Sequence, residues 1–180
     1  MKRKNLTATK KVKKNNIHFK DLKVLNFYSK FKSIISKKIK KNSFALAVSG
    51  GSDSLCLAYF GKMYSSEFGN RMHILIVDHK LRKNSHKEAI KVKKILSKKK
   101  ISCKILTWKN QIPMRNIQKN ARDIRYSLLS NYCAKNKIGY LITAHHQDDQ
   151  IENFLIRLLR GSGLTGLSSM SLDAKYNKNL

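Results

Sequence analysis

The hydrophobic positions of this chain form short apolar runs that alternate with segments of helical periodicity. The apolar runs have the length of buried strands and occupy residues 44–48, 73–77, 102–108 and 140–143. Around and between them, apolar residues recur every three or four positions, which predicts helices at residues 21–40, 55–60, 85–99 and 117–132. Strands that alternate with helices predict the α/β fold class, with a mainly parallel sheet, flanking helices and right-handed crossovers.

The same pattern predicts which helix residues are buried. The first helix is amphipathic and is expected to pack just before the first strand. Its apolar stripe consists of Leu22, Leu25, Tyr28, Phe31, Ile35 and Ile39. Ser85 and Glu88 have the spacing of a capping box, which predicts the start of the third helix. Cys56 and Cys133 lie among apolar helix residues, so we expect both thiols in the core.

The composition narrows the class of partner. A length of 180 residues predicts one domain with a single core. The formal charge of +29, from 39 basic and 10 acidic residues, predicts a polyanionic partner such as nucleic acid. Lysine and asparagine are abundant and arginine is scarce, as in proteins of AT-rich genomes, so we attribute part of the charge to compositional bias.

The spacing of the cysteines and the length of the apolar runs indicate the cellular location of the protein. The three cysteines form no C-x-x-C pair, which argues against a zinc ribbon, an iron–sulfur site or thioredoxin-like chemistry and suits a reducing cytosol. No apolar run has the length of a membrane span, so we expect a cytoplasmic protein with no membrane partner. Residues 1–20 contain no acid and predict a basic flexible arm, with an organellar transit peptide, and hence a stroma or matrix location, as the alternative.

A small polar loop follows the first strand and opens a helix. Its residues are Ser49, Gly50, Gly51, Ser52, Asp53 and Ser54. The glycines let backbone N–H groups approach an anion, and the positive end of the next helix points at the same place. The serines add hydroxyl donors, and the Asp53 carboxylate can hold a divalent cation against phosphate oxygens. The loop therefore predicts a phosphate site; the alternative is a tight turn with serine as the helix N-cap.

Two more polar clusters directly follow strands. They are residues 78–79, Asp-His, and residues 144–149, which open a helix. Asp149 and Glu152 lie three positions apart on one helical face, where they can share a magnesium ion or simply occupy the first turns of an ordinary helix. Since the carboxyl ends of parallel strands meet at one edge, the clusters predict a ligand site there.

Taken together, these motifs resemble the tRNA(Ile)-lysidine synthetase family of the PP-loop ATP pyrophosphatases. The matching segments are residues 49–54, 77–82, 116, 121–122, 125–126, 143–150 and 157–164. The resemblance implies an adenine nucleotide alpha hydrolase-like fold and divides the chain into a basic arm (1–20), a PP-loop ATP-binding catalytic domain (21–170) and a tail or the start of a further region (171–180). Family members usually continue into domains that help recognise tRNA, so we expect a catalytic domain or a reduced version of the enzyme.

The resemblance also implies a reaction. ATP adenylates carbon-2 of the wobble cytidine in an isoleucine tRNA with a CAU anticodon, and the amine of free L-lysine then displaces AMP to give lysidine. The cofactors are then ATP and Mg²⁺, and the enzyme is a ligase that forms a carbon–nitrogen bond. The oligomeric state stays open, with a dimer among the possibilities.

Individual roles follow from the same resemblance. Residues 49–54 would hold the pyrophosphate, and Asp53, Asp149 and Glu152 would arrange magnesium. His145 is a candidate general base for the incoming amine, or an orienting group. Three arginines are candidates to grip phosphates of ATP or tRNA in bidentate fashion. They are Arg115, Arg122 and Arg125.

Three alternatives remain at this stage. Another PP-loop tRNA-modifying enzyme would share the loop, although the absence of C-x-x-C argues against the thiolases. A metal-dependent phosphoesterase would use residues 78–79 and 145–149 as a metal cluster but leave the Ser-Gly-Gly loop without a role. A non-catalytic RNA-binding domain would explain the charge but not the polar clusters at strand ends.

Overall fold

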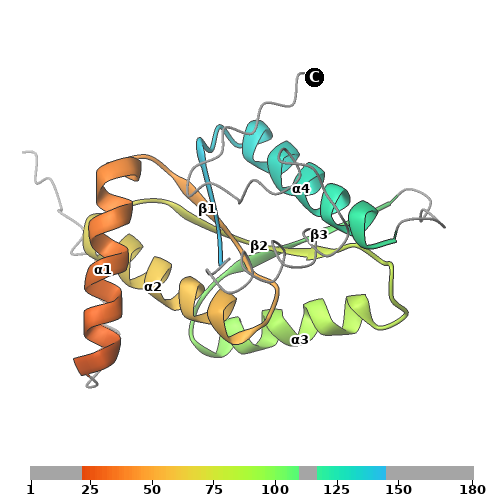
Figure 1. Cartoon of the computed structure of the whole chain (residues 1–180), viewed down its shortest axis with the longest axis horizontal. Helices are drawn as coiled ribbons and strands as arrows, with labels where there is room; N and C mark the ends of the chain where they lie inside the picture. Colours follow the sequence, from red (N-terminus) through yellow and green to blue (C-terminus); the bar gives the residue numbers. More distant parts are fainter. Residues whose placement is uncertain (1–21, 110–116, 145–180) are drawn as a thin grey trace, which may run out of the picture.

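The computed structural model of the protein describes residues 22–109 and 117–144. Along the chain they form α1 (Leu22–Ile39), β1 (Phe44–Ala47), α2 (Ser52–Phe68), β2 (Met72–Asp78), α3 (Ser85–Lys98), β3 (Cys103–Thr107), α4 (Ile117–Lys135) and β4 (Tyr140–Thr143). Figure 1 shows their arrangement. Strands and helices alternate as the hydrophobic pattern predicts, and each strand begins and ends within one residue of its predicted limits.

The strands form one parallel sheet in the order β3-β2-β1-β4. β1 pairs with β2 on one side and with β4 on the other, where Ala47 is level with Thr143. The chain therefore moves outward from β1 to β3 and then returns to place β4 beside β1. This reversal creates a switch point at the carboxyl ends of β1 and β4, where ligands bind in open parallel sheets. The predicted α/β fold is confirmed.

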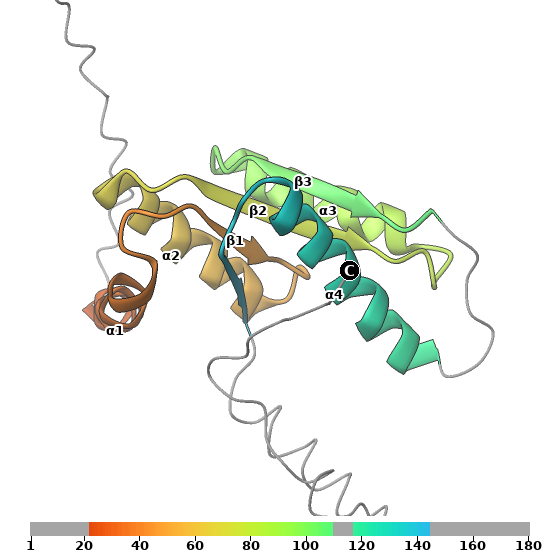
Figure 2. The same ribbon diagram turned by 90° about the horizontal axis from the view of Figure 1, so that it is seen from above.

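Helices cover both faces of the sheet. Leu46 and Ile74 pack in a core shared with α1, α2 and α3, whereas their neighbours Ala45 and Leu75 pack against α4. Figures 1 and 2 show α2 and α3 on one side of the strands and α4 on the other. Side chains alternate between the faces of a strand, so burial of both faces explains why these strands appear in the sequence as continuous apolar runs.

The first helix matches its predicted range but not all of its predicted burial. Tyr28, Ile35 and Ile39 are buried where α1 contacts α2. Leu22 and Leu25 are predicted in the same stripe, yet they are 81% and 40% exposed, and in this part of α1 Val24 packs against the core instead. None of the helices in residues 22–109 and 117–144 is long and apolar enough to cross a membrane.

Two local predictions fail. Cys56 is exposed, because Ser54 and Ala58 on either side of it turn the opposite face of α2 toward the core; Cys133 is buried as predicted. The capping box at Ser85 is wrong as well. The N-cap of α3 is Asn84 without a side-chain capping bond, and the hydroxyl of Ser85 is used elsewhere.

Candidate nucleotide site

The turn after β1 depends on Gly50. The N–H of Val48 donates to the carbonyl of Leu75 at 2.8 Å and extends the parallel pairing past β1. The chain then turns at Gly50 with φ of +100°, a value that residues with a side chain rarely adopt. A Cβ at this position would also meet Val92 Cγ2 of α3 at 2.4 Å. Backbone conformation and close packing on α3 both require glycine here.

Ser54 holds this turn from inside. Its side chain is buried, and its Oγ accepts the N–H of Gly50 at 3.0 Å while donating to the carbonyl of Gly51 at 2.9 Å. The hydroxyl of Ser49 donates to Ser54 Oγ at 3.3 Å. The sequence suggested Ser54 as a phosphate donor, whereas its hydroxyl already shapes the loop. A contact between Ser54 and phosphate stays a prediction.

The other polar residues of the loop are at the surface. Ser49, Ser52 and Asp53 are exposed, and Ser52 Oγ donates to Asp53 Oδ1 at 3.3 Å. The N-cap of α2 is Gly51 rather than a serine, and it supplies no side-chain capping bond. Because the first N–H groups of a helix have no acceptor within the helix, the start of α2 is suited to bind an anion. Asp53 stands in that first turn, where a carboxylate can hold a cation beside the anion.

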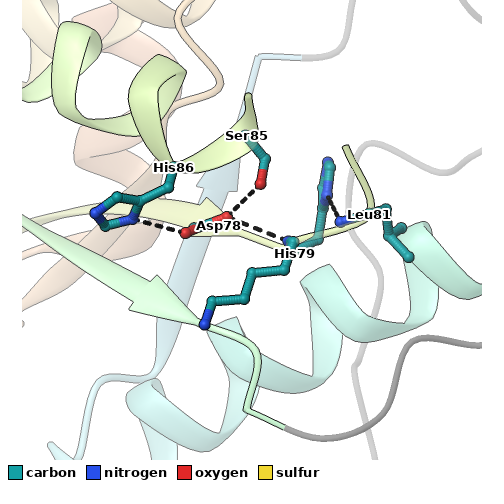
Figure 3. A network of polar contacts seen from close by, with 6 residues as sticks. Asp78, His79, Leu81, Ser85 and His86 are labelled. Atoms are coloured by element: carbon teal, nitrogen blue, oxygen red, sulfur yellow. Dashed lines mark hydrogen bonds and ion pairs between the residues drawn. The ribbon is translucent and has the colours of Figure 1, made fainter. Parts of the chain in front are cut away.

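The end of β2 carries a buried carboxylate. Asp78 is 0% exposed, and its Oδ1 accepts the hydroxyl of Ser85 at 2.6 Å and the N–H of Lys80 at 3.2 Å. Its Oδ2 lies 2.9 Å from Nδ1 of His86 (Figure 3). Burial alone would raise the pKa of Asp78, but the bonds from Ser85, His86 and Lys80 together hold the pKa below its ordinary value. The ionised carboxylate therefore ties the loop after β2 to the start of α3.

His79 lies next to this network. Its Nδ1 accepts the N–H of Leu81 at 3.2 Å, which leaves Nε2 to carry the proton of the neutral ring (Figure 3). Burial lowers the pKa of His79, and the positive charge of Arg125 on α4 lowers it further, partly opposed by Asp78. Arg125, one of the arginines predicted to bind phosphate, therefore acts electrostatically on a residue at the end of β2.

The remaining predicted residues are placed in part. Arg122 and Arg125 are exposed on α4, and the guanidinium of Arg122 lies 5.3 Å from the ring centre of Tyr126. The residues predicted outside the described ranges are Arg115, His145, Asp149 and Glu152. β4 ends at Thr143, level with the last residue of β1, so the strand that leads to the 144–149 cluster ends beside the Ser-Gly-Gly loop.

No group of three or more histidine, cysteine, aspartate or glutamate residues suited to hold a metal occurs in the described part of the chain. Asp78 is buried and both of its oxygens accept bonds from protein donors, which disfavours it as a ligand in the phosphoesterase alternative. Sequence reasoning missed the partners of Asp78. The available signal was a carboxylate at a buried strand end, which needs donors, followed seven and eight residues later by a serine and a histidine.

Comparison with known proteins agrees with this geometry. The chain matches the PP-loop domain family over residues 23–180. It is 46% identical over 128 residues to a tRNA(Ile)-lysidine synthase of Orientia tsutsugamushi (strain Boryong), a match that covers 71% of this chain and 29% of the relative. It is 41% identical over 154 residues to a tRNA(Ile)-lysidine synthase of Wolbachia pipientis wMel, covering 82% of this chain and 35% of the relative. The chain therefore spans about a third of the length of these curated relatives.

A solved structure supports the fold. The chain is similar to a U34-tRNA thiolase from Methanococcus maripaludis, with a TM-score of 0.63 and 19% sequence identity, over 77% of this chain and 52% of that protein. At this level of identity the likeness concerns the fold alone. It agrees with the parallel sheet and flanking helices described above.

Proposed function

The chain belongs to the PP-loop domain family, and from that membership we propose that it catalyses the tRNA(Ile)-lysidine synthetase reaction. Membership in a family of ATP pyrophosphatases implies that ATP is a substrate. The proposal adds the acceptor: carbon-2 of the wobble cytidine in an isoleucine tRNA with a CAU anticodon. Support comes from the relatives of 46% and 41% identity, whose names carry this activity.

The reaction has two steps with different demands on the protein. In the first, the cytidine oxygen attacks the α-phosphate of ATP, a carbon–oxygen–phosphorus link forms, and pyrophosphate leaves. In the second, the amine of free L-lysine attacks carbon-2, AMP leaves, and the amine loses a proton. Stabilising the pyrophosphate is the task of an anion site, and the proton needs a base.

We assign the anion site to residues 49–54. The turn at Gly50 and the start of α2 present backbone N–H groups to a phosphate group, while the exposed hydroxyls of Ser49 and Ser52 can donate further bonds. Ser54 keeps the loop in this conformation through its contacts with Gly50 and Gly51. Because these contacts restrain the loop, it loses little conformational freedom when ATP binds.

Magnesium fits this site in its chemistry. Mg²⁺ is usually held by one or two carboxylates together with substrate phosphates, and the exposed carboxylate of Asp53 lies in the first turn of α2. When bound with ATP, the ion supplies charge neutralisation at the pyrophosphate. Asp149 and Glu152 are the further ligands that we propose, and His145 is the proposed base for the lysine amine.

The edge of the sheet supplies positive charge for the remaining phosphates. The positive charge of Arg125 lowers the pKa of His79, which follows β2, and the Arg125 side chain is exposed and so accessible to a ligand. We propose that Arg125, with Arg122 and Arg115, binds phosphate groups of ATP or tRNA. We also propose isoleucine tRNA and L-lysine as the partners of the protein and the cytoplasm as its location.

The observation that carries this proposal is the position of the Ser-Gly-Gly loop. It follows β1 at the switch point, beside the end of β4, and it opens a helix that has no side-chain cap. The direct test is incubation of the protein with ATP, Mg²⁺, labelled L-lysine and an isoleucine tRNA transcript with a CAU anticodon. We expect label in the tRNA and equal amounts of AMP and pyrophosphate. ATP binding without transfer of lysine to any tRNA would overturn the proposal.

A further inference from the structure

The outer face of α3 carries a stripe of lysines. The inner face of this helix holds the buried residues Ala89, Val92 and Leu96. The outward lysines are all exposed and follow one another at steps of four, three and four residues. They are Lys87, Lys91, Lys94 and Lys98. At about 100° per residue, they fall on the side of the helix opposite the buried residues. We call these residues the α3 lysine stripe.

The stripe is electrostatically unfavourable in the protein alone. Like charges three or four residues apart on a helix repel each other, and each step of the stripe has that spacing. α3 contains one acidic residue, Glu88, which lies off the stripe by about a quarter turn. Within residues 22–109 and 117–144, no ion pair involves a stripe lysine. A face of one sign whose lysines form no ion pair among the described residues is complementary to a polyanion.

The helix that carries the stripe also borders the candidate nucleotide site. α3 starts beside Asp78 at the carboxyl edge of the sheet, and its inner face, opposite the stripe, closely approaches Gly50 at Val92. Exposed Arg82 and Lys83 precede it. Figures 1 and 2 show α3 as an outer layer, with one side on the sheet and the other turned away from the remaining elements. From Lys87 to Lys98 the stripe extends for about 16 Å, which is roughly the rise of five nucleotides in one strand of a duplex.

We propose that the α3 lysine stripe binds the sugar–phosphate backbone of tRNA and does so without reading its sequence. This inference rests on the proposed function, because tRNA is the polyanion that the reaction brings to this edge of the sheet. Lysine ammonium groups are point charges that suit phosphates and carry no base specificity by themselves. The stripe thus supplies affinity, and selection among tRNAs is left to other contacts.

The test compares two variants of equal charge. The stripe variant replaces Lys87, Lys91, Lys94 and Lys98 with glutamine. The control variant replaces four exposed lysines elsewhere with glutamine: Lys30, Lys37, Lys41 and Lys135. Binding of an isoleucine tRNA transcript and of an unrelated tRNA transcript is measured at several salt concentrations, without ATP or lysine. Circular dichroism and thermal melting verify that both variants fold.

The slope of log affinity against log salt reports the number of phosphate contacts. Each lost contact lowers the slope by about 0.7 to 0.9, so we expect the stripe variant to lose roughly 3 units and the control variant less than 1. The loss should be the same for both tRNAs. An equal loss of slope in the two variants would mean that only the net charge matters. A loss of slope for one tRNA alone would contradict binding to the backbone. Either result overturns the inference.

The outcome is separable from that of the proposed function. Lysidine formation together with an unchanged salt slope in the stripe variant would overturn the inference alone. Stripe-dependent tRNA binding without transfer of lysine would overturn the proposed function and leave an RNA-binding surface in place.

Discussion

Gly50 lies against Val92 so closely that a Cβ on the glycine would approach Val92 Cγ2 to 2.4 Å. The contact joins the loop after β1 to the middle of α3, two segments about 40 residues apart in the sequence. The Ser-Gly-Gly loop is therefore supported by α3 as well as by its own hydrogen bonds. Its shape depends on the packing of α3 on the sheet.

We first predict that Gly50→Ala destabilises the protein by about 2–4 kcal/mol, through unfavourable φ and through overlap with Val92. Gly69→Ala is a matched control, since Gly69 has φ of +75° but no neighbouring atom within 4 Å of the place that a Cβ would occupy. Gly69→Ala should lower the free energy of unfolding by only about 1–2 kcal/mol, which is the effect of the unfavourable φ alone. Urea unfolding measures both.

A double variant separates the two causes. Val92→Ala removes the methyl group that overlaps, so Gly50→Ala combined with Val92→Ala should be less destabilising than the sum of the single changes by at least about 0.5 kcal/mol. Strict additivity would mean that Val92 does not constrain the loop.

The contact between Gly50 and Val92 also illustrates what the sequence could and could not predict. The short apolar runs predicted the strands and the apolar period of three to four predicted the helices, because both patterns report burial against the two faces of the sheet. The glycines predicted a tight turn at residues 50–51. Which helix packs on that turn depends on tertiary contacts between distant segments, and no local pattern contains that information.

The failed predictions have the same origin. Ser85 and Glu88 have the spacing of a capping box, but the buried carboxylate of Asp78 competes for the Ser85 hydroxyl at 2.6 Å. Cys56 has apolar neighbours in sequence, yet it faces outward since the core contacts the other side of α2. In both cases tertiary packing, which the local pattern does not contain, decided the outcome.

We next predict that Ser54→Ala destabilises the protein by about 1–2 kcal/mol, because the N–H of Gly50 loses the acceptor that the buried Ser54 hydroxyl provides. Ser52→Ala, at an exposed position of the same loop, should change the free energy of unfolding by less than about 0.5 kcal/mol. Thermal unfolding compares the two. Similar values for both would show that Ser54 does not hold the turn.

A third prediction concerns pH. The folded-state pKa of Asp78 is below its ordinary value, so its contribution to stability is present above the unfolded pKa of about 3.9 and is lost as pH falls through the folded pKa. Asp78→Asn should reduce stability at pH 7 by about 1–3 kcal/mol. The difference in free energy of unfolding between the parent and Asp78→Asn should shrink as the pH falls below about 4.

Glu67 provides the control for this experiment. Burial raises its pKa, but bonds from Tyr28 at 2.8 Å and Lys32 at 3.0 Å outweigh that effect and lower the pKa overall. Its side chain is 43% exposed, so solvent screens the pair and Glu67→Gln should have a smaller effect at every pH. The free energy of unfolding of the parent and of Asp78→Asn could instead differ by a constant amount down to about pH 3. That result would contradict the role given to the buried carboxylate.

The fourth prediction tests the electrostatic link between α4 and the end of β2. Burial and Arg125 hold the pKa of His79 below its ordinary value, so Arg125→Gln should raise this pKa, while burial keeps it from reaching about 6.5. Arg82→Gln should raise the pKa less, and Arg122→Gln should leave it unchanged. Proton NMR of the imidazole across about pH 4–8 measures all three. A pKa that does not respond to Arg125→Gln would place that guanidinium away from His79.

The last prediction concerns Asp53. Its carboxylate is exposed in the first turn of α2, so its removal leaves no cavity, and Asp53→Ala should reduce stability by no more than about 1 kcal/mol. If the carboxylate holds magnesium against the pyrophosphate of ATP, the same change should lower the rate of lysidine formation by more than about a hundredfold. Asp53→Asn, which keeps the shape and removes the charge, should be similarly inactive.

The matched control is Asp123→Ala, which changes an exposed aspartate on α4 and should leave turnover unchanged. Circular dichroism establishes that each variant folds, and turnover of Asp53→Ala within a few-fold of the parent would remove Asp53 from the catalytic site.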